Sequence, residues 1–217
     1  TITGQSLRDF AKENIFDILG MQYTDYLPTI QQQDGKWINT VACPWMDRIA
    51  PTEKQKDGSV LCGQVHDPLA RILNGGISGN AGIFSNANDI GILAAALLNG
   101  GEYNGHRILS PLGVKTMCTV PRELTAFGRT PGWDIFSPYA SNKGDLFSPN
   151  TFGHTGYTGT SIIIDPDNDT AVILLVNAVH PEDRHSIVRL RSLVANAVAA
   201  SICPPAQAYT CLLYTSP

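Results

Sequence analysis

The segment Gly153–Thr160, with the sequence GHTGYTGT, combines one histidine with small and hydroxylated residues. Glycines beside a strand histidine allow the backbone to approach a ligand closely, because no side chain blocks the way. Thr155 can donate a hydrogen bond, and His154 can accept or donate a proton near neutral pH. The pattern predicts a strand that lines a ligand or catalytic site. The alternative interpretation is a glycine-rich turn with a surface histidine.

A second glycine-rich run, Gly75–Gly82, follows the dipeptide His66-Asp67. The run lacks the lysine of a phosphate-binding P-loop. Its Ser78 is followed directly by a glycine, so it is not the G-x-S-x-G nucleophile elbow either. A backbone turn before the next helix would explain these glycines. His66 and Asp67 could act as an oriented base, but neighbours on a strand point to opposite faces, which argues against that pairing.

The chain contains no recognisable metal or cofactor motif, so we expect it to use neither. Asp165–Asp169 resembles a calcium loop only in its acidic residues, because no glycine and glutamate follow at EF-hand spacing. A hairpin turn accounts for that segment. The cysteines form no C-x-x-C pair and have no histidine at ligand spacing. We interpret them as unpaired thiols, at positions 43, 62, 118, 203 and 211.

Composition limits the class of protein that can carry these motifs. A chain of 217 residues with 43% hydrophobic residues fits one globular domain and excludes a disordered chain. Fifteen Lys and Arg against nineteen Asp and Glu give a net charge of −4, without a basic run. Nucleic acid is therefore not an expected partner. No apolar stretch approaches the roughly 20 residues of a membrane span.

Helix caps predict three helices in the first part of the chain. Ser6 begins a capping-box-like sequence, and apolar residues follow at helical spacing until Gly20. Ser85 is the expected N-cap of a second helix, which a glycine pair ends. Ser110-Pro111 should start a short third helix. Residues 22–65 show neither a helical nor a strand period, so mostly loop is expected there.

After residue 151 the pattern changes to strands. Ser161–Asp165 and Thr170–Asn177 are rich in β-branched residues and are joined by a turn sequence, which predicts a hairpin. Glu182 and Asp183 should lie in the first turn of a final helix. Clustered strands with helices elsewhere indicate an α/β (α+β) fold, an antiparallel sheet flanked by helices. We expect one domain over residues 1–202.

The N-terminus has the character of a cut end, and the C-terminal residues are expected to lie outside the domain. Thr1 leads almost at once into the first helix, without an initiator methionine or a signal peptide. Residues 203–217 follow the last helix as a tail outside the domain. Within it, residues 211–217 resemble a translated sequencing adapter, so we leave them out of the fold.

Taken together, these segments resemble the serine β-lactamase-related family, which includes class C β-lactamases, D-alanyl-D-alanine carboxypeptidases and related esterases and amidases. Each motif is short, but their order along residues 1–202 is specific. The matching segments are Thr3–Leu7, Leu19–Met21, Ile49–Glu53, Val65–Asp67, Gly75–Ser85, Leu97–Gly101, Trp133-Asp134, Gly144–Phe147, Gly153–Thr160 and Ile164–Pro166. The resemblance implies a β-lactamase/transpeptidase-like sheet.

The resemblance implies acyl transfer, in which the serine of an S-x-x-K motif attacks a carbonyl while the lysine and a Y-x-N tyrosine move protons. His154-Thr155-Gly156 then matches the third motif, K-T-G or H-T-G. His154 would replace the lysine that holds the substrate carboxylate, and the backbone N–H of Tyr157 would be an oxyanion donor. The H-T-G form is more typical of an esterase, peptidase or amidase than of a β-lactamase. Candidate substrate-binding residues are Gly79, Asn80 and His66.

No serine or threonine in the chain has a lysine three residues on, and no tyrosine has an asparagine two residues on. In similar proteins both motifs precede the segment that matches Thr3–Leu7. We therefore expect the C-terminal part of a serine hydrolase, inactive alone, with a sheet incomplete on its N-terminal side and prone to self-association. The favoured substrates are muropeptides, and the suspected compartment is periplasmic or extracellular. The alternatives are a catalytically dead binding module and a promiscuous carboxylesterase.

Overall fold

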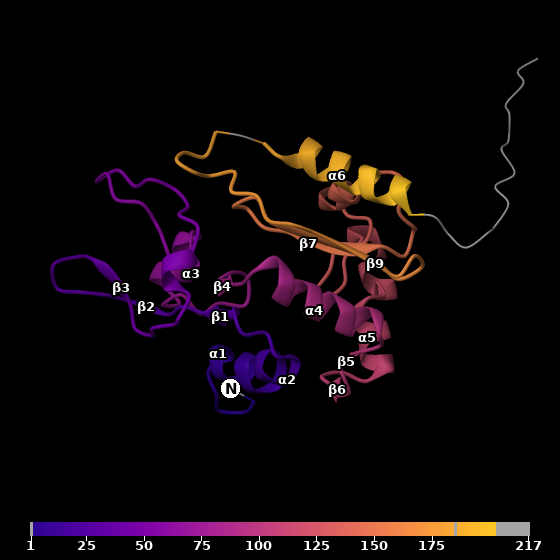
Figure 1. Ribbon diagram of the computed structural model, residues 1–217, viewed down its shortest axis with the longest axis horizontal. Coiled ribbons are helices and arrows are strands. Elements are labelled where there is room, and N and C mark those ends of the chain that lie inside the picture. The colour runs from indigo at the N-terminus through magenta and orange to yellow at the C-terminus, as the bar shows by residue number, and fades with distance from the viewer. Residues whose placement is uncertain (1, 185, 203–217) are drawn as a thin grey trace, which may run out of the picture.

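The computed structural model describes residues 2–184 and 186–202 (Figure 1). The expected tail of residues 203–217 lies outside the described residues. An antiparallel sheet of order β7-β8-β9 forms the centre. Its strands are β7 (Phe152–Thr155), β8 (Ser161–Asp165) and β9 (Thr170–Leu174). The predicted hairpin is confirmed, although β9 ends three residues earlier than expected.

Two helices cover opposite faces of this sheet, as Figure 1 shows. They are α4 (Ala87–Leu98) and α6 (Val188–Ser201). Side chains alternate between the faces of a strand. Phe152 and Ile164 therefore pack with Ala94 and Leu97 of α4, whereas Ile163 and Val172 pack with Ala195 of α6. The expected α+β architecture, an antiparallel sheet flanked by helices, is confirmed.

A short segment before β7 extends the sheet at its other edge. Asp134 and Gly153 exchange two backbone hydrogen bonds, with N–O distances of 2.9 and 3.0 Å. The chain between α4 and β7 also forms a hairpin and short helical segments. These are β5 (Glu102–Tyr103), β6 (His106–Arg107), α5 (Pro111–Met117), η3 (Arg122–Phe127) and η4 (Pro138–Lys143). Ser110 caps α5 as predicted, because its Oγ accepts from Gly113 N at 3.0 Å.

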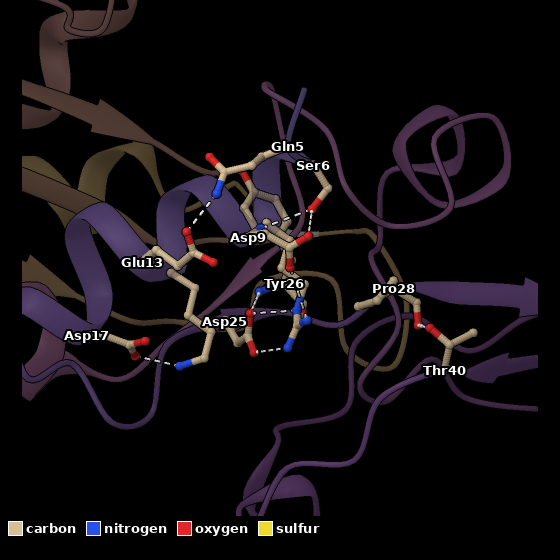
Figure 2. A network of polar contacts seen from close by, with 11 residues as sticks. Gln5, Ser6, Asp9, Glu13, Asp17, Asp25, Tyr26, Pro28 and Thr40 are labelled. Carbon is tan, nitrogen blue, oxygen red and sulfur yellow. Dashed lines mark hydrogen bonds and ion pairs between the residues drawn. The ribbon is translucent and has the colours of Figure 1, made fainter. Parts of the chain in front are cut away.

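The N-terminal helical region also begins and ends where the sequence predicts. It consists of α1 (Leu7–Ala11), the π-helical turn η1 (Lys12–Phe16) and α2 (Asp17–Leu19). Ser6 accepts from Asp9 N at 3.0 Å, and Gly20 ends α2 in the left-handed conformation. Arg8 of α1 forms a two-point contact with Asp25 at 2.6 and 2.9 Å. Figure 2 shows this polar network, which joins the helices to Asp25 and Tyr26.

Residues 22–85 contain only short elements, and within them residues 22–65 are mostly loop, as the lack of periodicity predicts. These are β1 (Asp25–Tyr26), β2 (Thr29–Gln31), β3 (Trp37–Asn39), η2 (Met46–Arg48), α3 (Pro68–Ile72) and β4 (Ile83–Phe84). The strands form two separate pairs, β1 with β4 and β2 with β3. We call residues 22–85 the loop-rich region.

Two predicted helix starts are wrong. The N-cap of α4 is Asn86 rather than Ser85, because Asn86 Oδ1 accepts from Asp89 N at 2.8 Å. Ser85 instead bonds Thr24 Oγ1 at 2.7 Å. The last helix begins at Val188, so Glu182 and Asp183 lie in the preceding loop rather than in its first turn. Their carboxylates bond other side chains: Glu182 pairs with Arg184, and Asp183 accepts from Tyr157.

None of the helices in the described ranges is long and apolar enough to cross a membrane.

Candidate active-site wall

His154 lies on β7 with an exposed side chain, and its two ring nitrogens have different partners. Nδ1 is 3.0 Å from the carbonyl oxygen of Thr155, and Nε2 is 3.1 Å from Nη2 of Arg129. A carbonyl can only accept and a guanidinium can only donate. The arrangement therefore fits the neutral imidazole with its proton on Nδ1 and its lone pair on Nε2.

Arg129 was not predicted as a site residue. Its Nε is 2.8 Å from Oδ1 of Asp134, a carboxylate that is only 3% exposed. Asp134 also accepts from Ser137 Oγ at 2.6 Å. Because Asp134 pairs with Gly153 in the sheet, the guanidinium is brought beside the next residue of β7, which is His154. The backbone pairing and the buried carboxylate together hold a cation against the histidine.

A cavity of about 750 Å³ opens beside this pair. Three predicted site residues, Gly79, Asn80 and His154, line it together although they come from distant parts of the sequence. The remaining lining residues are Arg129, Thr130, Pro131 and Gly132. The structure thus brings part of the predicted site into one cavity and adds the loop 129–132, in which Arg129 carries a positive charge.

Asn80 is held through the oxygen of its side chain. Ser78 Oγ donates to Asn80 Oδ1 at 2.6 Å, and Asn74 Nδ2 donates to Ser78 Oγ at 3.0 Å. Within the described part of the chain, the Asn80 amide NH₂ has no hydrogen-bond acceptor. This exposed donor is therefore available to a ligand in the cavity.

The turn between β7 and β8, residues 156–160, carries the proposed oxyanion donor. Gly156 N donates to Thr160 O at 2.7 Å, and Gly159 N donates to Gly156 O at 3.1 Å. Across residues 2–184 and 186–202, neither the backbone N–H of Tyr157 nor the hydroxyl of Thr155 has a hydrogen-bond partner. Both groups are therefore available to a ligand, as an oxyanion donor and a substrate-contacting hydroxyl must be. Tyr157 and Thr155 do not line the 750 Å³ cavity.

The side chain of Tyr157 contacts His66 rather than the cavity. The rings stack with centroids 5.7 Å apart and an interplanar angle of 20°. The Tyr157 hydroxyl donates to Asp183 at 2.5 Å, and this hydrogen bond and the aspartate charge raise the pKa of the tyrosine. His66 Nε2 lies 3.1 Å from Glu53 Oε2. The role of His66 in substrate binding stays a prediction.

His66 and Asp67 do not act as a pair. Asp67 caps α3, because its Oδ1 accepts from Ala70 N at 2.7 Å. The nearest carboxylate bonded to the His66 ring belongs to Glu53, thirteen residues earlier. Among the described residues, no group of three His, Cys, Asp or Glu side chains could hold a metal ion.

Comparison with known proteins identifies the family. The sequence profile of the Beta-lactamase family matches residues 1–196. A protein of Escherichia coli K12 named "Putative D-alanyl-D-alanine carboxypeptidase" is 35% identical over 194 residues, which cover 83% of this chain and 42% of that protein. A protein of Salmonella agona with the same name is 32% identical over the same shares. The chain thus spans about two fifths of the length of these curated relatives.

A solved structure shows the same fold. A beta-lactamase from Mycobacterium bovis superposes with a TM-score of 0.56 at 20% identity, covering 91% of this chain and 57% of that one. The fold and the profile match agree, and the chain belongs to the beta-lactamase family of serine hydrolases.

Proposed function

We propose that this chain forms one wall of the active site in a longer serine hydrolase, which cleaves an ester or amide through an acyl-enzyme. The favoured substrates are peptidoglycan-derived muropeptides whose peptide stem ends in a free carboxylate. The cavity that joins Arg129, His154 and Asn80 carries this proposal. The name of the Escherichia coli relative, a carboxypeptidase for D-alanyl-D-alanine, supports the same substrate class.

The charges in the cavity favour a carboxylate. The Arg129 guanidinium is fixed through Nε by the buried Asp134, and its Nη2 faces His154. Nη2 also lies 3.4 Å from Asp134 Oδ2, so Nη1 is the guanidinium nitrogen left, among the described residues, to donate a charge-assisted hydrogen bond to a substrate carboxylate. Asn80, from the loop-rich region, adds an amide donor that has no acceptor among the described residues. A terminal carboxylate seated there would accept from donors of both regions.

The reacting carbonyl would lie farther along β7. The Thr155 hydroxyl at the end of β7 and the Tyr157 backbone N–H in the following turn have no partner among the described residues, so both can donate to a ligand. The Tyr157 N–H would stabilise the negative charge that develops on the carbonyl oxygen. The nucleophile must come from outside this sequence, because no serine here has a lysine at the family spacing.

Ligand binding to the 217-residue chain tests the carboxylate site directly. D-alanyl-D-alanine should shift the His154 imidazole signals in NMR, whereas D-alanyl-D-alanine amide, which lacks the carboxylate, should not. Arg129→Gln should weaken the response about tenfold or more, since a charged hydrogen-bond donor is lost. Arg122→Gln is the matched control, because Arg122 is an exposed arginine of η3 outside the cavity. Equal responses to both dipeptides would contradict the proposal.

Activity tests the enzyme assignment. The 217-residue chain should not hydrolyse nitrocefin or p-nitrophenyl acetate above background, and no serine should react with a fluorophosphonate probe. In a longer protein that carries S-x-x-K, His154→Ala should lower kcat/KM by about tenfold or more. A muropeptide hydrolysed faster than p-nitrophenyl esters supports the peptidase over a carboxylesterase. Binding without hydrolysis by the longer protein would indicate a binding module instead.

A further inference from the structure

The turn at residues 156–160 is held from the interior by an arginine of α6. Arg191 Nη2 donates to Gly156 O at 2.8 Å and to Thr160 O at 3.0 Å. These are the residues whose backbones already bond each other across the turn, Gly156 N to Thr160 O. One guanidinium nitrogen therefore bridges both ends of the turn that carries Tyr157.

The environment of Arg191 is unusual for a cation. The residue is only 8% exposed, and burial lowers the pKa of its guanidinium. It forms no ion pair with a carboxylate of the described chain, and its Nε has no partner there. Burying a charge against carbonyl groups alone is costly compared with leaving it in water. The stabilisation it provides is therefore concentrated on the two carbonyls that it bonds.

The other contacts of the turn leave it little freedom. A Cβ on Gly156 would overlap Thr160 Oγ1, and a Cβ on Gly159 would overlap Val176 O. Ala178 N donates to Thr158 O at 2.7 Å, and the Tyr157 hydroxyl bonds Asp183 at the surface. The outer contacts hold Thr158 and the side chain of Tyr157. Among the side chains of residues 2–184 and 186–202, only Arg191 bonds the carbonyls at both ends of the turn.

We propose that Arg191 is a positioning residue that fixes the orientation of the Tyr157 backbone N–H by holding the carbonyls of Gly156 and Thr160. A peptide unit is planar, so a carbonyl held at Gly156 also fixes the N–H of the same unit, which belongs to Tyr157. The role of that N–H in catalysis rests on the proposed function, whereas the role of Arg191 in holding the turn does not.

Amide hydrogen exchange in the 217-residue chain tests this role. Arg191→Met keeps the length and apolar part of the side chain and removes the donors. We expect the Gly156 and Gly159 amides to exchange about tenfold faster or more, while Ile163 in β8 changes less than about twofold. Arg189→Met is the control, because Arg189 is an exposed arginine of the same helix. It should leave the turn unchanged.

The other outcomes overturn the proposal. Equal acceleration in the turn, β8 and α6 would show that Arg191 only stabilises the fold. Unchanged turn amides would show that it does not hold the turn. If Arg191→Met does not fold, Arg191→Lys is read by the same criteria, because a lysine keeps the charge but cannot reproduce the guanidinium geometry.

Catalysis gives a second, distinguishable readout. In a longer protein with S-x-x-K, Arg191→Met should lower kcat about tenfold with little change in KM, because the donor acts mainly in the transition state. A loss of kcat/KM of the same size that came from a higher KM alone, with kcat unchanged, would contradict a positioning role. The dipeptide titration of the Arg129 cavity is a separate experiment. Its failure would contradict the proposed substrate, whereas the exchange result would still decide the role of Arg191.

Discussion

The sheet with its two helices and the loop-rich region are stabilised in different ways. In the sheet, continuous backbone ladders join β7, β8 and β9, and side chains on each face pack against α4 or α6. In the loop-rich region, backbone pairing is limited to the short pairs β1–β4 and β2–β3, and side chains also bond isolated carbonyls. Asn39 Nδ2 donates to Gly63 O at 2.7 Å, and Arg71 Nη1 donates to Val65 O at 2.6 Å.

The site lies where these two regions meet. The sheet contributes His154 and, through the Asp134 pairing, Arg129. The loop-rich region contributes Gly79 and Asn80. A rigid strand holds the reactive group in place, whereas a loop tolerates the sequence variation that changes specificity. We therefore expect substitutions in the sheet to affect stability more than equivalent substitutions in the loop-rich region.

The largest difference in stability should appear when a glycine is replaced by alanine in each of the two regions. A Cβ at Gly153 would overlap the carbonyl oxygen of Ile162 in β8, whereas a Cβ at Gly79 would meet nothing within 4 Å. Gly153→Ala should lower the free energy of unfolding by about 3 kcal/mol, and Gly79→Ala by less than about 0.5 kcal/mol. Urea denaturation measures both. Similar losses would show that the regions do not differ.

A buried carboxylate in the sheet should make stability depend on acid. Burial raises the pKa of Asp165, but hydrogen bonds from Ser148, Asn168 and Asp167 N outweigh it and hold the pKa below its usual value. The stabilisation is therefore present above about pH 4 and is lost as pH falls through the folded-state pKa. Asp165→Asn should lower the free energy of unfolding by about 2 kcal/mol at pH 7. It should also make the stability of the protein fall less steeply as the pH is lowered.

The matched acid control lies in the loop-rich region. Hydrogen bonds from Ser59 lower the pKa of Asp57, but its side chain is exposed, so solvent screens the interaction. Asp57→Asn should leave both the stability at pH 7 and its fall at low pH almost unchanged. Thermal melts between pH 2 and pH 7 compare the two variants. An equal effect of Asp57→Asn would mean that burial does not decide the acid response.

Removing a helix cap should also act differently in the two regions. Asp67 caps the five residues of α3, and Asn86 caps the twelve residues of α4, which pack on the sheet. Each change to alanine should cost about 1 kcal/mol. Asp67→Ala should open α3 locally, because a helix this short has little support of its own. Faster exchange of the Arg71 amide without a matching change in α4 would confirm the difference.

The smallest change in stability is expected for a substitution at the edge of the sheet, which should instead change the self-association of the chain. Within the described residues, β9 pairs only with β8, so its outer edge offers unpaired backbone groups to another chain. We expect the chain to self-associate, and Leu175→Lys should reduce this, because Leu175 follows β9 and is 46% exposed. Val172 is not a suitable position, since it is buried towards α6.

The control for association is a lysine in the other region. Leu69 of α3 is 63% exposed, so Leu69→Lys removes an apolar side chain far from the sheet edge in sequence. Light scattering at micromolar concentration compares the variants with the wild type. A larger decrease in self-association with Leu69→Lys than with Leu175→Lys would show that the chains contact each other through α3. A monodisperse wild-type monomer would refute self-association altogether.

Local patterns predicted much of the fold. The turn after Asp165, the left-handed Gly20 and the Ser110 cap each depend on residues within four positions, so their physics is visible in a short window. The starts of α4 and α6 were missed because Ser85, Asn86, Glu182 and Asp183 all suit a helix start. Tertiary partners decided between them: Ser85 bonds Thr24, and Asp183 bonds Tyr157.

The hairpin, the caps of α1 and α5 and the candidate strand with His154 could be predicted, because these follow from neighbouring residues and from the family pattern. Only the tertiary structure placed Arg129 beside His154 and Arg191 beneath the turn. The first contact spans 25 residues and the second 35, and each depends on sheet pairing or helix packing. No short-range pattern marks such residues, because a strand histidine and the backbone carbonyls of a turn become their partners only in the folded chain.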